Sequence, residues 1–355
     1  MNRKDLVDKL EQVAPALSGN DLIPILTHFW FTGEHVLAYN DQIAISAPCK
    51  VDFEGAVPGM TLLNLLKASR AKDVEFVVGK DDKNELTIKA ASSRFKLGLL
   101  PYRDFEEVFV MPKPGKDPEA LSTKSFLSCI DCCMRSVSID TSVPDQLGIT
   151  LIPDGKDLLF YSTDDRTLSH ARLAVKGGTS LKQRVILSSH FCRQVLNLVN
   201  DAKPLHLEIH KDHALLMGAG GTLLFGKLVH SEKPLNFNSI LDHNFPEGSE
   251  NKLVTIPTKL ELILERAVIV ASASVEPVRT HINVQGGVVR FSTVSARGEV
   301  HDTLQIEGKH KDVEIKVDAK LLKNGYGQFD QMLLTSSCFV MVNEDVLYLV
   351  AASGS

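Results

Sequence analysis

Residues 147–163, LGITLIPDGKDLLFYST, have the pattern of an apolar strand, a turn at Asp154-Gly155 and a second strand with alternating apolar residues. The same design occurs in residues 26–40 (LTHFWFTGEHVLAYN), with a turn at Gly33-Glu34. It occurs again in residues 278–294 (VRTHINVQGGVVRFSTV), with a turn at Gly286-Gly287. Three hairpins of one design indicate a unit that is repeated three times along the chain.

A helical stretch precedes each hairpin, and a second helical stretch with another strand pair follows it. The second half of the unit recurs every 130 residues, because its helical stretches open at Val57, Leu187 and Val317. A period this long indicates three domains, since solenoid repeats run about 20 to 50 residues. The strand pairs that follow are VEFVV with LTIKA, LHLEI with ALLMG and CFVMV with VLYLV. The six helical stretches are 2–18, 57–72, 122–139, 188–203, 257–272 and 317–329.

Two segments rich in proline, glycine and polar residues separate the repeats. Residues 111–118 (MPKPGKDP) and 242–251 (DHNFPEGSEN) interrupt regular structure and suit linkers. We therefore expect an α+β protein of three similar domains, 1–117, 118–247 and 248–355, each with two helices packed on antiparallel sheets. The length of 355 residues gives each domain enough chain to bury a core of its own.

The composition is that of a soluble globular protein, with 44% hydrophobic and 23% charged residues. No run approaches the roughly 18 apolar residues of a membrane helix, and no secretory leader is recognisable. We expect a cytoplasmic protein with no membrane contact.

Histidines and cysteines give weak support for a metal site or an enzyme. We interpret the cysteines mainly as small buried hydrophobic residues, because no second CxxC motif or paired histidine cluster accompanies them. Metal binding and redox chemistry are the alternatives. In residues 206–213 (HLEIHKDH), strand alternation places His206 and His210 on one face by default. No nucleophile elbow or phosphate-binding loop is present, so we expect no catalysis, cofactor or metal. The cysteines are Cys49, Cys129, Cys132, Cys133, Cys192 and Cys338.

The distribution of charge is more informative than the formal net charge of −5. The six helical stretches together carry +6, which leaves −11 on the rest of the chain. Solvated helix faces would also explain this difference. Alternatively, helices on one side of a curved array of sheets could face an anion, and two chains joined head to tail could close the array. Such a ring would hold DNA through backbone electrostatics without reading bases.

The residues resemble the bacterial β sliding clamp, the processivity subunit of the replicative DNA polymerase, over essentially the whole chain. Residues 23–26 (IPIL) resemble the family's Leu-Pro-Ile-Leu segment, and 94–105 (RFKLGLLPYRDF) resemble its Arg-Phe-x-Leu, Leu-Pro and Asp-Phe elements. Residues 147–149 (LGI) and 162–168 (STDDRTL) resemble its Leu-x-Gly and Ala-Thr-Asp-Gly-x-Arg-Leu segments. Residues 266–270 (RAVIV) and 347–350 (LYLV) resemble a helix and the final strand of its third domain.

The resemblance implies a homodimeric ring that encircles duplex DNA, is opened by a clamp loader and tethers a replicative polymerase and other factors. It also implies a pocket for partner peptides in the second and third domains. Core packing explains several of these positions equally well, and 163–165 suit a turn. The implied pocket residues are Leu147, Thr163, Asp165, Arg166, Thr167, Leu168, Ile240 and Leu349.

Subunit and DNA contacts follow from the same resemblance. The implied dimer residues are Phe105, Ile269 and Val270, and residues 92–99 form a candidate exposed strand edge. On the helix within 57–72, Lys67 and Arg70 lie off the apolar stripe and can point at phosphates. The DNA-facing candidates, each of which also fits an ordinary surface charge, are Lys67, Arg70, Lys72, Lys124, Arg135, Arg193, Lys259, Lys320 and Lys323.

The chain departs from the family pattern at three places. Residues 351–355 (AASGS) stand where a Met-Pro-Met-Arg type tail is usual, Asp165 replaces a glycine, and Asn20-Asp21 stand where an arginine is common. We hypothesise a clamp tuned to a different polymerase, for example one encoded by a bacteriophage; pull-down by a host polymerase peptide as strong as that of the host clamp would exclude this. The alternative function is a protein-interaction scaffold built on the same repeats without DNA encirclement.

Overall fold

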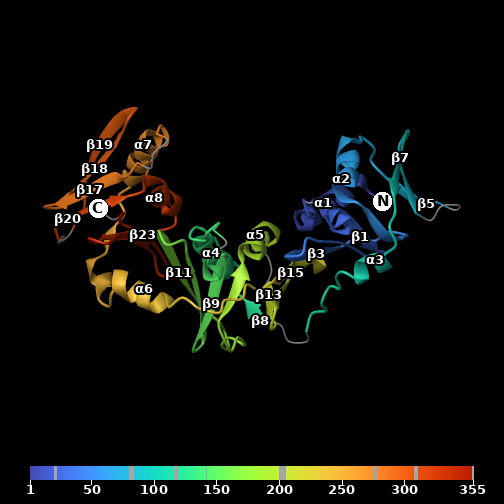
Figure 1. Ribbon diagram of the computed structural model, residues 1–355, viewed down its shortest axis with the longest axis horizontal. Helices are drawn as coiled ribbons and strands as arrows, with labels where there is room; N and C mark the ends of the chain where they lie inside the picture. The colour runs from blue at the N-terminus through green and yellow to red at the C-terminus, as the bar shows by residue number, and fades with distance from the viewer. Residues whose placement is uncertain are drawn as a thin grey trace. The chain divides into compact units, whose positions relative to one another are not determined.

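The computed structural model describes residues 1–19, 22–79, 84–115, 119–140, 142–199, 205–274, 278–307 and 311–353. Asn20-Asp21 and the predicted domain boundary at 117/118 lie outside this part of the chain. The chain forms two compact units (Figure 1). Unit 1 comprises Met1–Lys124 with His190–Leu228, and unit 2 comprises Ser125–Ser189 with Val229–Ser355.

Unit 1 is built on an antiparallel sheet of eight strands in the order β4-β1-β2-β3-β15-β14-β13-β8. Strands β3 and β15 join the two halves, with Ile45 opposite Leu224. A smaller sheet has the order β5-β6-β7. The strands are β1 (His28–Thr32), β2 (His35–Tyr39), β3 (Ile43–Pro48), β4 (Glu54–Pro58), β5 (Glu75–Val78), β6 (Glu85–Ala90), β7 (Ser93–Gly98), β8 (Glu119–Leu121), β13 (Leu205–Ile209), β14 (His213–Met217) and β15 (Leu223–Lys227).

Helices cover both faces of the larger sheet in unit 1. Helix α1 (Arg3–Val13) is capped by the Asn2 side chain and packs on β2, β3 and helix α2 (Gly59–Ala68). On the opposite face, Phe105 of the short helix α3 (Arg103–Glu106) lies 4.1 Å from the Trp30 ring. Helix α5 (Ser189–Leu198) presses Phe191 against Gly226, where a larger residue would clash.

Unit 2 repeats this plan with a second antiparallel sheet of eight strands, in the order β12-β9-β10-β11-β23-β22-β21-β16. Its halves join where β11 pairs with β23. A sheet of four strands has the order β19-β18-β17-β20. The strands are β9 (Gly148–Asp154), β10 (Asp157–Thr163), β11 (Thr167–Ala174), β12 (Val185–Ser188), β16 (Val254–Thr255), β17 (Thr280–Gln285), β18 (Val288–Ser295), β19 (Gly298–Gln305), β20 (Val313–Val317), β21 (Gln331–Leu334), β22 (Cys338–Val342) and β23 (Val346–Ala351).

The two faces of the larger sheet in unit 2 carry different helices. Ser169 donates to the carbonyl of Cys132 on α4 (Thr123–Met134), and Tyr348 donates to that of Leu321 on α8 (Ala319–Gly325), which packs against α7 (Leu260–Ser272). The other face, which we call the α6 face, carries Tyr161, Leu168 and Leu349 beneath α6 (Phe237–Asn244) (Figure 1). The short 3-10 helices are Ala14–Ala16, Pro24–Thr27, Pro144–Gln146, Ala219–Gly221 and Ser249–Lys252.

The α+β fold expected from the sequence is confirmed, and so are the three hairpins. Gly33, Gly155 and Gly286 have φ values of 83°, 61° and 56°, which glycine adopts without steric cost. The interpretation of residues 242–251 as irregular linker was wrong in part. Asp242 lies in helix α6, and residues 249–252 form a 3-10 helix, because their apolar neighbours pack on the sheet. Among the described helices, none is both long and apolar enough to cross a membrane.

Candidate functional site

Three of the expected pocket residues meet on the α6 face. Leu168 on β11 is paired with Leu349 on β23, and both are buried, with exposures of 2% and 3%. Ile240 on α6 is half-buried and packs against the same cluster. The structure thus brings together residues that are at least 72 positions apart in the sequence. Their side chains pack in a core beneath α6 and do not line an open groove.

Leu147 and Asp165 are linked through Gln146. Leu147 is half-buried at the start of β9, and the Gln146 side-chain amide donates a 2.6 Å hydrogen bond to the carboxylate of Asp165. Asp165 has a φ of +67°, in the left-handed region that favours glycine. The aspartate keeps the backbone conformation that a glycine would adopt and adds a carboxylate that ties this turn to residue 146.

The turn between β10 and β11 is held by side chains of its own. One oxygen of Asp164 accepts hydrogen bonds from the backbone amides of Arg166 (3.1 Å) and Thr167 (2.6 Å) and from the Thr167 hydroxyl (2.8 Å). The Thr163 hydroxyl donates to the Thr167 carbonyl at 2.6 Å. Thr163 and Thr167 are buried, so they build the turn, while Asp165 and Arg166 remain exposed.

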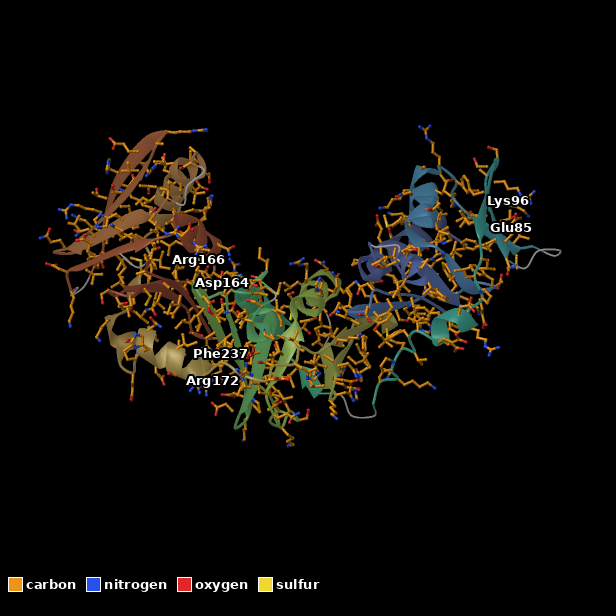
Figure 2. All side chains as sticks on the ribbon, viewed as in Figure 1. Glu85, Lys96, Asp164, Arg166, Arg172 and Phe237 are labelled. Atoms are coloured by element: carbon orange, nitrogen blue, oxygen red, sulfur yellow. The ribbon has the colours of Figure 1, made fainter. Side chains whose placement is uncertain are left out.

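Arg166 is engaged by a residue far away in the sequence. Its guanidinium lies 2.6 Å from the carboxylate of Asp318, which Arg279 also approaches at 3.3 Å. Asp318 in turn caps α8 by accepting from the amide of Lys320. Arg166, labelled in Figure 2, therefore connects the β10–β11 turn to the first turn of α8. No sequence pattern within residues 162–168 signals this partner.

Aromatic residues outside the expected set organise the α6 face. The Tyr161 ring stacks on Phe237 with centroids 5.1 Å apart, and its hydroxyl donates to the Asn238 side chain at 2.9 Å. Burial raises the pKa of Tyr161 to about 12, so the phenol stays neutral. The sequence analysis missed Phe237 because the polar residues around it obscure the pattern of the short helix that carries it. The available signal was weak: the spacing of Phe237, Ile240 and Leu241 fits one face of a short helix.

A buried ion pair holds the segment that leads into α6. Asp145 is 1% exposed and pairs with Arg184, whose guanidinium also lies 5.4 Å from the centre of the Phe237 ring. Arg184 donates to the Leu235 carbonyl at 2.8 Å, and Ser231 donates to Asp145. Because a buried carboxylate needs partners, these contacts fix where the chain enters α6.

His170 lies under the same aromatic stack. Its ring is 4.5 Å from that of Tyr161, and its Nδ1 is 3.2 Å from the Phe160 carbonyl, a geometry in which Nδ1–H donates. Desolvation lowers the pKa of His170 to about 4. The side chain is therefore neutral near pH 7 and acts as part of the apolar face.

The candidate DNA-facing residues fall into two groups. Lys67 pairs with Glu11 at 2.6 Å, Arg135 with Asp131 at 3.0 Å and Lys323 with Glu265 at 3.2 Å, so part of their charge is compensated. The other six are exposed, and within the described chain they have no ion-pair partner. They are Arg70, Lys72, Lys124, Arg193, Lys259 and Lys320.

Three of these lysines lie at helix N-termini. Lys124 is in the first turn of α4, Lys259 is the residue before α7 and Lys320 is in the first turn of α8. The positive end of the helix dipole disfavours a cation there, by about 0.3 to 1 kcal/mol. Lysines in such places add to a positive local potential and serve anion binding better than helix stability.

The expected subunit contacts differ in their exposure. Phe105 is 1% exposed and packs on Trp30, so in the single chain it supports α3 from beneath. Ile269 on α7 is 69% exposed, and Val270 is half-buried. Among the residues that the structure describes, β7 pairs only with β6 and β19 only with β18, which leaves a free edge on each strand. Lys96 of β7 reaches Glu85 of β6 at 2.8 Å (Figure 2).

Cysteines and histidines form no metal-binding group of three or more among the described residues. All six cysteines are buried, and burial raises the pKa of Cys129 and of Cys132 to about 12, which makes them poor nucleophiles. His210 stacks on His213 with centroids 4.5 Å apart.

Comparison with known proteins agrees with the geometry. Residues 1–109 match the family model described as DNA polymerase III beta subunit, N-terminal domain. The beta subunit of Streptococcus pyogenes DNA polymerase is 17% identical, with a TM-score of 0.84 over 100% of this chain and 99% of that chain. A putative DNA polymerase III beta subunit from Eubacterium rectale is 12% identical, with a TM-score of 0.86 over 100% and 98%.

A third structure, pol III beta of Caulobacter crescentus, is 20% identical, with a TM-score of 0.83 over 100% and 99% of the two chains. No curated protein sequence matches. The resemblance inferred from sequence motifs is thereby confirmed, at an identity low enough to mark the chain as divergent.

Proposed function

We propose that the protein is a DNA sliding clamp of the bacterial β type, a non-catalytic processivity factor that encircles duplex DNA and tethers a replicative polymerase. The observation that carries the proposal is the coverage of the fold. The whole chain shares its fold with bacterial beta subunits over 98–99% of their lengths, and its first 109 residues match the corresponding family model.

The ring closes between two copies of the chain. We assign three domains, 1–117, 118–247 and 248–355, to each copy, so that two copies supply six similar halves. The free edge of β7 in one copy faces the free edge of β19 in the other, with Ile269 and Val270 beside it. Unpaired strand edges invite such pairing, and a head-to-tail contact closes when it is repeated twice.

DNA is held without base recognition. The nine basic candidates supply positive charge from helix ends and helix faces, and phosphate contacts of this kind carry no sequence information. Affinity then depends on salt, while retention on DNA depends on the closed ring. A clamp loader opens the ring, and the site of action is the cytoplasm.

Partner peptides bind at the α6 face. We assign Leu147, Asp165, Arg166 and Ile240, which all have accessible atoms, to the edge of this binding site. Leu168 and Leu349 lie beneath, with Thr163 and Thr167 shaping the adjoining turn.

DNA topology provides the test of this function. The protein is loaded onto nicked circular DNA with the loader of its source organism, washed at high salt, and the DNA is then cut once. A clamp stays on the circle and leaves after the cut. Equal retention on linear DNA would indicate direct binding, and no retention on the circle would favour the alternative, a protein-interaction scaffold that does not encircle DNA.

A further inference from the structure

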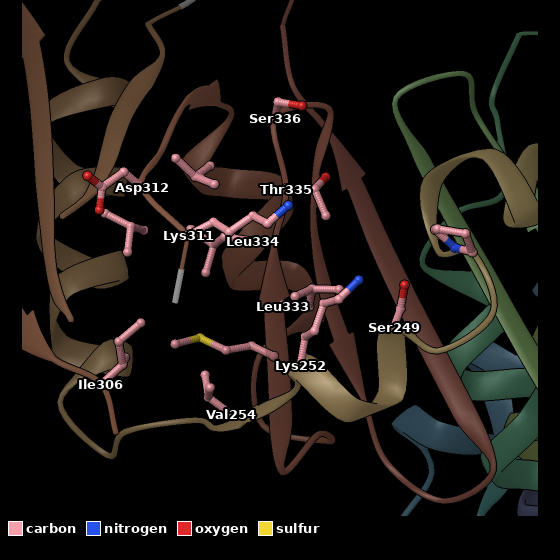
Figure 3. Close-up of a pocket in the computed structure, with 14 residues that line it drawn as sticks. Ser249, Lys252, Val254, Ile306, Lys311, Asp312, Leu333, Leu334, Thr335 and Ser336 are labelled. Carbon is pink, nitrogen blue, oxygen red and sulfur yellow. The ribbon is translucent and has the colours of Figure 1, made fainter. Parts of the chain in front are cut away.

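A pocket of about 610 Å³ lies in unit 2, next to the cluster of the α6 face, with which it shares Leu333 (Figure 3). Strands β17 and β20 of the four-stranded sheet form one wall, and β16 and β21 at the edge of the eight-stranded sheet form the other. The segment from Pro246 to Lys252 closes one side. The volume of the pocket falls in the range of about 300 to 1,000 Å³ that is usual for small-molecule sites.

The walls of this pocket are apolar and well ordered by packing. Met332, Val284, Ile306 and Leu333 have exposures of 0%, 2%, 8% and 9%. Their backbones are fixed by strand pairing, since Met332 is opposite Val254 and Val284 is opposite Val313. The pocket is thus part of the folded domain.

Polar groups gather at one end. Figure 3 shows the amino groups of Lys252 and Lys311 pointing toward the side where Thr335 and Ser249 lie, with Ile306 and Val254 on the opposite side. Within the described residues, neither lysine has an ion-pair partner.

Asp312 is the one carboxylate among the described lining residues, and it forms no ion pair with either lysine. Asp312 accepts a hydrogen bond from the backbone amide of Gly286 at 3.3 Å, on the β17–β18 turn. Two cations at one end of an apolar cavity select an anion, because a cationic head group would be repelled there. An apolar body with one anionic head satisfies both ends of the pocket at once.

We propose that this pocket binds a small amphipathic carboxylate, with its apolar chain between the two sheets and its carboxylate between Lys252 and Lys311. The site shares none of the residues assigned to DNA, to the subunit contact or to the partner-peptide pocket, although Leu333 also packs in the cluster of the α6 face. The proposal therefore stands independently of the clamp function.

The test uses decanoate as the probe and the full-length protein. Isothermal titration calorimetry measures its affinity, and methyl NMR of Met332, assigned with Met332→Leu, reports the place of binding. Decanoate should bind and shift the Met332 methyl signal, whereas protonated decylamine should bind at least tenfold more weakly. The double variant Lys252→Gln/Lys311→Gln should weaken decanoate binding about tenfold, as two exposed ion pairs would.

Two control variants distinguish binding in the pocket from effects of overall charge or stability. Lys316→Gln removes an exposed lysine of β20 outside the pocket and should leave decanoate affinity unchanged. Val254→Trp should fill the cavity and abolish binding while the thermal unfolding midpoint stays near that of the parent. Failure of decanoate to bind, an unmoved Met332 signal, or equal affinity for decylamine would overturn the proposal.

Discussion

Asp165 shows how one residue can replace a glycine without changing a turn. Its φ of +67° costs an ordinary L-residue about 1 to 2 kcal/mol, although aspartate tolerates this region better than most. The 2.6 Å hydrogen bond from Gln146 offsets part of that cost, by about 1 kcal/mol. The departure from the family pattern noted in the sequence is therefore accommodated locally.

This balance predicts different stabilities for two small substitutions of Asp165. Asp165→Gly loses the hydrogen bond but relieves the backbone, so its free energy of unfolding should stay within about 0.5 kcal/mol of the parent. Asp165→Ala loses the bond and keeps the strain, and it should be about 1 kcal/mol less stable than Asp165→Gly. Urea unfolding measures both. An alanine variant as stable as the glycine variant would contradict the argument.

At the scale of elements, the α6 face depends on a neutral histidine. The folded pKa of His170 is about 4, against 6.5 for the free side chain. The unfolded chain therefore binds more protons between these values, and stability must fall as pH falls from 6.5 toward 4. The loss approaches about 3 kcal/mol when the histidine is forced to charge.

His170→Phe keeps the stack on Tyr161 and removes the titration. Between pH 6.5 and 4, the free energy of unfolding of this variant should fall less than that of the parent, and the two declines should differ by up to about 3 kcal/mol. Urea unfolding at several pH values measures both. Identical pH profiles for the two proteins would show that His170 is solvated in the folded state.

Helix-terminal lysines provide a second prediction at this scale. Lys259→Gln with Lys320→Gln should lower the slope of log affinity for DNA against log salt by up to about 2, one for each lost phosphate contact. Lys316→Gln with Arg290→Gln, which changes exposed residues on β20 and β18, should leave the slope unchanged. Fluorescence anisotropy with a short duplex measures the slopes. Equal slopes for the two double variants would show that the helix-terminal lysines do not contact DNA.

The same elements show what sequence could and could not predict. Hairpins were predictable because turn glycines and alternation are local signals. Helix α6 was not, since residues 237–244 gain their stability from Tyr161 and the sheet beneath. The pairing of β3 with β15 was also out of reach, because no pattern in residues 43–46 specifies a partner at 223–226. Leu168 and Leu349 were expected in one pocket and are cross-strand neighbours in the structure, but their burial could not be predicted without tertiary context.

At the scale of the whole molecule, Ile269 is the most exposed of the proposed interface residues. Ile269→Asp would place a charge in an apolar contact, so dimer affinity should fall at least about tenfold while the monomer remains folded. Met60→Asp, at a comparably exposed position on α2, serves as the control and should leave the dimer intact. Sedimentation velocity distinguishes the two, and equal dissociation of both variants would argue against a specific contact at Ile269.

Closure of two chains into a ring is the central claim, and the molar mass in solution tests it most directly. Multi-angle light scattering at micromolar protein, repeated at nanomolar concentration by mass photometry, should give twice the chain mass of 39.0 kDa. A mass of one chain at both concentrations would leave β7 and β19 unpaired and contradict the closed ring.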